Sequence, residues 1–202
     1  TERYIEVLKI DSLVLASSSE YRLRLLKQLM IVPGEVISPD LDESVHKGEL
    51  PRLYAERVAR EKALKVFSSR PDKFVLGADT VAYCGRRIML KTDDEAQATE
   101  YLEMISGRRH RVCTAVCLCA PTGDVRVRSV VSVVKFKRLS KDEIDCYIRS
   151  GEWKGKAGGY SIQGWAGALI SWMQGSHSSI VGLPLHETYC LLSGYFKLTH
   201  IP

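Results

Sequence analysis

Residues 13–29 read LVLASSSEYRLRLLKQL, and this stretch decides the fold class. Residues 13–16 are a short apolar run of the kind that forms a buried strand. The serines at 17–19 follow at once, and serine hydroxyls commonly cap the first turn of a helix. From there to Leu29, apolar side chains recur at helical spacing. A buried strand that turns directly into an amphipathic helix is typical of α/β proteins.

Strands and helices continue to alternate along the chain, so the α/β prediction extends to all of it. The further predicted elements are a helix over 53–66, a strand over 74–83, a helix from the capping box at 92–95, strands over 112–119 and 125–136, a helix from the capping box at 140–143 to Gly151, a strand over 168–172 and a helix over 184–192. We expect a mixed twisted sheet with flanking helices, in two lobes around a cleft, with the 112–136 hairpin region as the second lobe.

Length and composition are those of one globular domain. The 202 residues are 45% hydrophobic and 26% charged, which is ordinary for a chain with a proper core. No run reaches the roughly 18 apolar residues of a membrane helix. The first ten residues alternate charged and apolar side chains, unlike a secretory signal. We therefore expect one domain over 1–202, located in the cytoplasm and without membrane contact.

The six cysteines predict neither a disulfide framework nor a zinc site. Cys113, Cys117 and Cys119 have spacings that place all three on one face of a strand, where small apolar thiols pack. No CxxC pair is present. Buried or idle thiols suit a reducing compartment.

The formal net charge of +5 suits an anionic partner, either nucleic acid or a small polyphosphate. Basic clusters occur at 108–111 and 135–138, but solvated surface charge explains them equally well. The turn at 17–19 is a more specific candidate, because a helix amino terminus presents free N–H groups to an anion. Arg22, one turn further, can reach a phosphate with its planar fork. Serine capping without any ligand is the alternative.

Two groups of acidic residues are candidates for catalysis. Asp40, Asp42 and Glu43 lie in what we expect to be a loop between two helices. Asp79 interrupts an apolar strand, where an unpaired carboxylate would be costly. Carboxylates with few histidines nearby favour Mg²⁺ or Mn²⁺ over zinc. A surface-turn aspartate is the alternative for Asp79, so its role remains open at this point.

Other residues are less specific when taken singly. Lys62 and Lys91 are each explained as solvated charges. The histidines form no HxxH or HExxH pair and no serine lies in a GxSxG elbow, so a metal-activated water is favoured over zinc hydrolysis or a nucleophilic triad. Gln163, in a glycine-rich segment over 158–164, offers a donor and an acceptor as base recognition requires, or lies in a plain turn.

Taken together, these segments resemble the Maf family, the septum-formation-inhibitor-like nucleotide pyrophosphatases. The matching motifs are Leu15-Ala16-Ser17-Ser18-Ser19 with Arg22, Asp42-Glu43-Ser44, Arg60-Glu61-Lys62-Ala63, Gly77-Ala78-Asp79-Thr80-Val81, Lys91, Ala157-Gly158-Gly159-Tyr160-Ser161-Ile162-Gln163-Gly164 and Val181-Gly182-Leu183-Pro184-Leu185. These motifs occur in a fixed order over nearly the whole chain. Their combination is a far more specific signal of the family than any single motif.

The resemblance implies an inosine-triphosphatase-like fold with a cleft between two lobes, and usually a homodimer. It implies a Mg²⁺- or Mn²⁺-dependent cut of a nucleoside triphosphate into a monophosphate and pyrophosphate, which argues against nucleic acid as the partner. Asp79 falls on the general base and Glu43 on an acidic position near the metal, so both are expected at the metal. The positions that hold phosphates are Ser17, Arg22, Lys62 and Lys91, and of these Arg22 and Lys62 are expected to touch only phosphate.

Within the family, Thr80 and Gln163 match the branch that is similar to dTTP/UTP pyrophosphatases, which implies house-cleaning of the nucleotide pool. Tyr21 departs from that branch, which commonly has an arginine there, whereas the branch acting on 7-methyl-GTP has an aromatic. An aromatic ring can stack on a base. Two alternatives stay open: a 7-methyl-GTP pyrophosphatase, and a non-catalytic nucleotide-binding regulator of cell division. Asp79 with Lys62 and Lys91 argues against the regulator, because binding alone needs no retained base.

Overall fold

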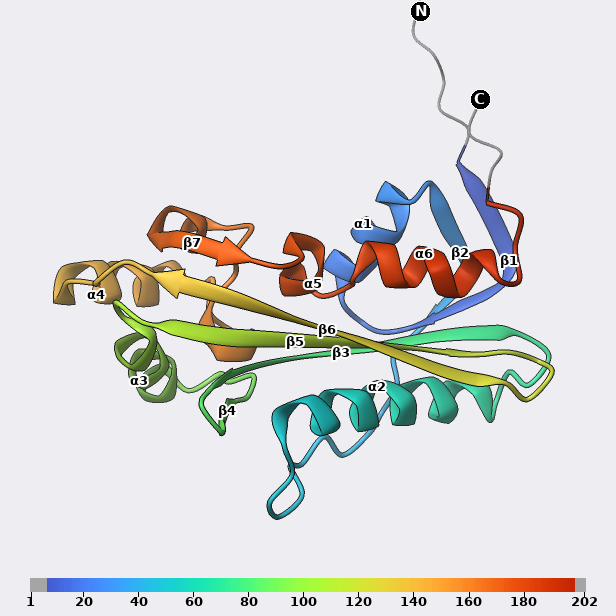
Figure 1. The fold of residues 1–202 in the computed structure, drawn as a ribbon, viewed down its shortest axis with the longest axis horizontal. Helices are drawn as coiled ribbons and strands as arrows, with labels where there is room; N and C mark the ends of the chain where they lie inside the picture. The colour runs from blue at the N-terminus through green and yellow to red at the C-terminus, as the bar shows by residue number, and fades with distance from the viewer. Residues whose placement is uncertain (1–6, 199–202) are drawn as a thin grey trace, which may run out of the picture.

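The computed structural model describes residues 7–198 and contains one mixed sheet with helices on both faces (Figure 1). The strands are β1 (Leu8–Ala16), β2 (Ile31–Ile37), β3 (Phe74–Cys84), β4 (Arg87–Met89), β5 (Arg109–Cys119), β6 (Val125–Phe136) and β7 (Ile170–Gln174). The helices are α1 (Glu20–Gln28), α2 (Pro51–Phe67), α3 (Glu95–Ile105), α4 (Lys141–Ser150), α5 (His177–Val181) and α6 (Leu185–Ser193), with short 3-10 helices η1 (Ala157–Gly159) and η2 (Trp165–Leu169).

The strand order is β2-β1-β3-β5-β6-β7, and β4 pairs with β3. β1 runs parallel to β2 and β3, whereas the other pairs are antiparallel. The prediction of an α/β fold built on a mixed sheet is confirmed.

The strand and helix predicted from residues 13–29 are present, but the serines do not cap the helix as expected. Ser19 is the N-cap of α1, and its side chain makes no capping hydrogen bond. Ser17 Oγ instead accepts the backbone N–H of Ser19 at 3.2 Å and a hydrogen bond from Arg22 at 3.1 Å. The Ser17 hydroxyl does not cap the helix, because the buried Arg22 guanidinium donates to it and holds this hydroxyl beside the start of the helix.

β2 is a strand that the sequence analysis missed, so residues 40–43 lie between a strand and a helix and not between two helices. Pro33 and Gly34 disguise the strand pattern. An edge strand tolerates proline, and β2 is the edge of this sheet. Gly34 is required because a Cβ there would lie 2.5 Å from the Asp11 carbonyl oxygen.

One of the two predicted capping boxes is confirmed and the other is wrong. Ser140 caps α4 through a reciprocal box, and Gly151 ends that helix in the left-handed conformation. α3 is capped by Asp94, whose carboxylate accepts the N–H of Ala96. Thr92 Oγ1 accepts the N–H of Asp94 and so supports the cap without being part of the helix.

The two lobes share the long β5–β6 hairpin, so the hairpin region that was expected to be the second lobe contributes to both. At one end of the molecule α3, α4, β4, β7 and the 3-10 helices enclose an apolar core (Figure 1). At the other end α2 covers one face of the sheet, and α1 and α6 cover the other. A two-stranded ribbon has no core of its own, and helices must complete each lobe. The strand expected over 168–172 begins at Ile170, because η2 occupies the residues before it.

The cysteine prediction is confirmed, since Cys113, Cys117 and Cys119 share the buried face of β5 under α2. Within residues 7–198, none of the helices has both the length and the apolar character needed to cross a bilayer. The expectation about a secretory signal rests on the first ten residues, most of which lie outside the described residues.

Candidate active site

Two carboxylates and one lysine meet between β3 and α2. Asp79, on β3, is only 1% exposed, and Lys62, on α2, is 4% exposed. Lys62 Nζ donates to Asp79 Oδ1 at 2.8 Å and lies 2.8 Å from Glu43 Oε1. Buried charges persist when they are paired in this way. Asp79 is therefore a paired carboxylate and not a surface-turn aspartate, and Lys62 is not a solvated charge.

Gly77 explains how α2 comes close enough for this pairing. It precedes Asp79 by two positions and so shares its face of β3. A Cβ at Gly77 would lie 2.7 Å from the Ala59 carbonyl oxygen and 2.8 Å from the Ala63 backbone nitrogen. Only glycine lets the helix backbone pack directly on the strand here, and this places Lys62 over Asp79.

The loop that carries Glu43 is attached to α2 by two side chains. Tyr54 Oη donates to the Glu43 carbonyl oxygen at 2.9 Å. Arg57 donates to both carboxylate oxygens of Glu49, at 2.6 and 2.8 Å, and to the Ser44 carbonyl oxygen at 3.0 Å. The Arg57 hydrogen bonds lower the pKa of Glu49 to about 2, so the pair stays ionised at neutral pH. Glu43 is thus held over the pair of buried charges.

Lys91 approaches the same carboxylate from the end of β4. Its Nζ lies 3.8 Å from Glu43 Oε2, and its side chain is 45% exposed. Burial of its charge lowers the pKa of Lys91, and the neighbouring charges of Lys62 and Arg22 lower it further. Burial alone would raise the pKa of Glu43, but the hydrogen bond from Lys62 and the charge of Lys91 outweigh this and hold it below the usual value. Glu43 is therefore an ionised carboxylate surrounded by cations.

Arg22 is buried and makes three hydrogen bonds within the protein. Its Nε donates to the Gly182 carbonyl oxygen at 2.8 Å, Nη1 to Ser17 Oγ at 3.1 Å and Nη2 to Thr80 Oγ1 at 3.3 Å. Arg22 therefore orients Thr80 within the protein, and its expected contact with phosphate stays a prediction. Lys62 likewise contacts the two carboxylates.

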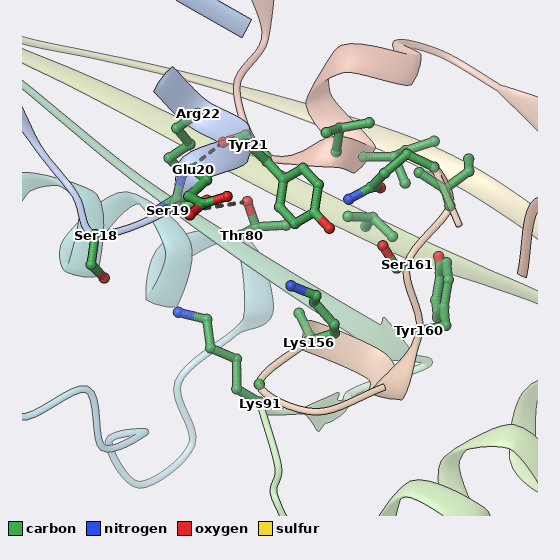
Figure 2. A pocket seen from close by; sticks show the side chains of 18 residues that line it. Ser18, Ser19, Glu20, Tyr21, Arg22, Thr80, Lys91, Lys156, Tyr160 and Ser161 are labelled. Carbon is green, nitrogen blue, oxygen red and sulfur yellow. Dashed lines mark hydrogen bonds between the residues drawn. The ribbon is translucent and has the colours of Figure 1, made fainter. Parts of the chain in front are cut away.

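A cavity of about 560 Å³ lies between the lobes, as expected, with the first turn of α1 on one side and residues 155–163 on the other. It shares Thr80 and Lys91 with a smaller cavity of about 150 Å³ that contains Glu43 and Asp79. Figure 2 shows the Tyr21 ring above Lys156, with Lys91 below and Tyr160 farther along the wall. The larger space suits a nucleoside, and the smaller one is lined by charges that suit phosphate chemistry.

The structure brings the predicted specificity residues Tyr21, Thr80 and Gln163 to the wall of this larger cavity. Sequence reasoning missed Lys156, whose Nζ lies 4.6 Å from the centre of the Tyr21 ring. A lysine directly before the motif that begins at Ala157 was the available signal. The sequence held no signal for Tyr54 and Arg57, because each acts only through residues of the 43–49 loop that folding brings near.

The carboxylates of the site available to a divalent cation are Asp79 and Glu43. Among residues 7–198, no group of three or more histidine, cysteine, aspartate or glutamate side chains could hold a metal ion by itself. Asp79 and Glu43 would therefore bind a metal ion as two protein ligands, with the substrate or water completing its coordination.

A comparison with known families identifies this arrangement. The family model described as Maf-like protein matches residues 12–195. The chain belongs to the Maf family.

Relatives support this membership over the whole length. The nucleoside triphosphate pyrophosphatase of Anaplasma phagocytophilum (strain HZ) is 99% identical over 193 residues, covering 96% of this chain and 100% of that protein. The dTTP/UTP pyrophosphatase of Wolbachia sp. subsp. Brugia malayi (strain TRS) is 55% identical over 190 residues, covering 94% and 96%. The chain is therefore an enzyme of the Maf family, a hydrolase.

One solved structure bears on the fold alone. The Ham1 protein of Staphylococcus aureus is 15% identical, with a TM-score of 0.54 over 94% of this chain and 100% of that one. The inosine-triphosphatase-like fold expected for a Maf protein is confirmed by this likeness.

Proposed function

We propose that this Maf protein acts as a single domain over 1–202 and hydrolyses nucleoside triphosphates to the monophosphate and pyrophosphate, favouring dTTP and UTP. The observation that carries the proposal is that the two cavities adjoin, since Thr80 and Lys91 line both. A nucleoside in the larger cavity places its phosphates beside the buried pair of Asp79 and Lys62. The name of the relative that is 99% identical, a nucleoside triphosphate pyrophosphatase, supports this chemistry.

Asp79 is the general base of the proposed reaction. Lys62 occupies its Oδ1, and no hydrogen bond from residues 7–198 reaches Oδ2. That oxygen takes a proton from a water molecule as the water oxygen attacks the α-phosphorus. The bond between the α-phosphorus and the oxygen bridging to the β-phosphorus breaks, and pyrophosphate leaves with the electron pair.

The cations of the site offset the negative charge that develops on the leaving pyrophosphate. We assign this role, together with phosphate binding, to Arg22, Lys62 and Lys91, and phosphate binding through its hydroxyl to Ser17. A guanidinium has five N–H donors, and Arg22 uses three within the protein, so two remain for phosphate oxygens.

Asp79 and Glu43 would hold a divalent cation, Mg²⁺ or Mn²⁺. The two carboxylates are neighbours, because each has an oxygen 2.8 Å from Lys62 Nζ. Proteins commonly bind Mg²⁺ through one or two carboxylates, with substrate phosphates and water completing the shell. The residues present fit this pattern, and the cation would neutralise phosphate charge.

The preference for dTTP and UTP rests on Thr80 and Gln163, and the name of the Wolbachia relative supports it. The alternative within the same chemistry is 7-methyl-GTP, which Tyr21 favours. Lys156 lies over the Tyr21 ring, so the aromatic side chain has a defined place in the cavity wall.

The remaining proposals come from family membership. The chain acts as a homodimer in the cytoplasm and removes non-standard or surplus nucleotides, with neither membrane nor nucleic acid as a partner. A non-catalytic regulator of cell division is the alternative from another class, and turnover measured without any partner protein separates the two.

The decisive experiment measures pyrophosphate release from a panel of nucleoside triphosphates, including 7-methyl-GTP, with Mg²⁺ or Mn²⁺. We expect the highest kcat/KM for dTTP and UTP, and no activity after metal removal. Asp79→Asn keeps the shape but removes the base, so its rate should fall by about 10²–10⁴ while its unfolding transition stays cooperative. Asp145→Asn, an exposed change on α4, is the control. Near-normal turnover of a folded Asp79→Asn protein would contradict the proposed mechanism.

A further inference from the structure

The hydroxyl of Thr80 lies where the two cavities meet and takes part in a chain of hydrogen bonds. Arg22 Nη2 donates to Thr80 Oγ1 at 3.3 Å. On the other side, Thr80 Oγ1 lies 2.9 Å from Thr114 Oγ1, on the neighbouring strand β5. Thr114 is fully buried, and its Oγ1 lies 2.6 Å from the Ser179 carbonyl oxygen.

The direction of this chain follows from counting protons. A carbonyl oxygen has no proton, so Thr114 must donate its single hydroxyl proton to Ser179. Thr114 can then only accept from Thr80. Thr80 therefore donates its own single proton to Thr114, which points away from the substrate.

What remains on Thr80 is a single lone pair. A hydroxyl oxygen has two lone pairs, and an N–H of Arg22 uses one of them. Phosphate oxygens need donors, so Thr80 has nothing to offer a phosphate even though it lies next to Asp79 on β3. Its substrate partner must carry an N–H or O–H donor.

We propose that Thr114 fixes Thr80 as a hydrogen-bond acceptor, and that Thr80 receives a donor of the nucleoside and not of the phosphates. Two donors share this chemistry: the imide N3–H of thymine or uracil, and a sugar hydroxyl. The imide separates thymine and uracil from cytosine, which has a lone pair at N3. Thr114 is thus a positioning residue for specificity, although it does not line the cavity. This inference rests on the proposed function and deepens it.

Thr114→Val tests the inference, because valine keeps the shape but cannot receive the Thr80 proton. Thr80 can then rotate and donate to an acceptor. If the partner is the imide, kcat/KM for dCTP relative to dTTP should rise about three- to tenfold, the usual effect of one hydrogen bond. If the partner is the sugar, the same rise should occur for 3′-O-methyl-dTTP, which keeps the oxygen but loses the donor. Thr114→Ser keeps the hydroxyl and should retain both wild-type ratios.

The inference is overturned if a folded Thr114→Val protein changes neither ratio. If Thr114→Val does not fold, Thr80→Val replaces it, since it leaves the Thr114–Ser179 contact in place. Thr80→Val must lose the preference for dTTP over dCTP or over 3′-O-methyl-dTTP. If both preferences are unchanged, the inference is overturned.

Binding measurements separate this inference from the proposed function. The affinities of non-hydrolysable α,β-methylene analogues of the same nucleotides report the Thr80 contact without turnover. A wild-type protein that releases no pyrophosphate from any nucleotide contradicts the proposed function. If the wild-type protein cleaves dTTP, and Thr114→Val changes neither kcat/KM ratio, only the inference is contradicted.

Discussion

Arg22 illustrates the residue scale, because one buried guanidinium serves two purposes. Its bonds to Gly182 and Ser17 join α1 to the segment after α5, and its bond to Thr80 reaches the cavity wall. The remaining N–H groups are free for phosphate. In the proposed function, phosphate binding and the orientation of Thr80 are therefore linked through a single side chain.

At the same scale, Gln163 and Tyr21 are the residues that we propose to decide base preference. Gln163 is exposed in the cavity wall, so Gln163→Ala should leave stability unchanged. If its amide reads the base edge, kcat/KM for dTTP and UTP should fall at least about three- to tenfold. Tyr21→Arg restores the pattern common in the dTTP/UTP branch and should leave dTTP and UTP cleavage equal or better. Pyrophosphate release from dTTP, UTP and 7-methyl-GTP measures both effects.

Gln174→Ala, on β7 and away from this cavity, is the matched control. A wild-type protein that favours 7-methyl-GTP, with a preference that Tyr21→Arg removes, would show that the aromatic decides the substrate. The assignment to dTTP and UTP would then be wrong.

At the scale of elements, the approach of α2 to β3 creates the site. Gly77→Ala would place a methyl group 2.7 Å from the Ala59 carbonyl oxygen and push the helix outward. Overpacking of this kind costs about 1–3 kcal/mol of unfolding free energy. Because Lys62 lies on the displaced helix, we expect the loss of kcat, expressed as a free energy, to exceed the loss of unfolding free energy. Urea unfolding and kcat measure the two effects.

Gly194→Ala is the control for this substitution, because the nearest atom to an added Cβ there is 3.5 Å away and φ is −69°. Equal losses of activity in the two folded variants would show that close packing at Gly77 does not position Lys62.

The loop that carries Glu43 is a second element with a testable attachment. Arg57→Ala removes its bonds to Glu49 and Ser44 and frees the loop. Groups that orient metal ligands typically affect metal affinity about 10- to 100-fold, so the Mg²⁺ concentration for half-maximal activity should rise by about tenfold or more. Arg52→Ala, on the same helix, removes contacts with Glu56 and Ser129 but none with the loop that carries Glu43, and it is the control. An unchanged Mg²⁺ requirement in Arg57→Ala would contradict a positioning role.

At the scale of the whole molecule, the lobe formed by α3 and α4 makes stability depend on pH. His110 is 2% exposed, its Nε2 lies 2.8 Å from Tyr160 Oη, and its Nδ1 has no hydrogen-bond partner among residues 7–198. Burial lowers the pKa of His110 to about 4. The unfolded chain takes up this proton near pH 6.5, so it binds more protons than the folded state between these values. The free energy of unfolding should therefore fall as the pH drops from about 6.5 to about 4.

The full effect of such a shift is about 3 kcal/mol, and His110→Gln should remove most of this pH dependence. Urea unfolding at pH 7 and pH 5 measures it, with the exposed His177→Gln as the control. A wild-type protein whose unfolding free energy has the same pH dependence as that of His110→Gln would contradict this account.

Local patterns in the sequence were sufficient for most of the fold. The run at 13–16, the hairpin around Gly123 and the box at Ser140 were all predicted, because periodicity and turn chemistry act between near neighbours. β2 was missed, since Pro33 conflicts with a strand pattern that is allowed only at a sheet edge. The family motifs likewise located Asp79, Lys62 and Glu43 as residues of interest.

Only the tertiary structure decided what those residues do to one another. Lys62 and Asp79 are 17 positions apart, and Thr80 and Thr114 are 34 apart. Lys62 and Asp79, taken singly, were each compatible with a solvent-exposed role. A buried charge or hydroxyl is stable only with its partner, so its role depends on which residue folding places beside it. That choice is made by packing between distant segments, such as α2 against Gly77, and no local pattern in the chain records it.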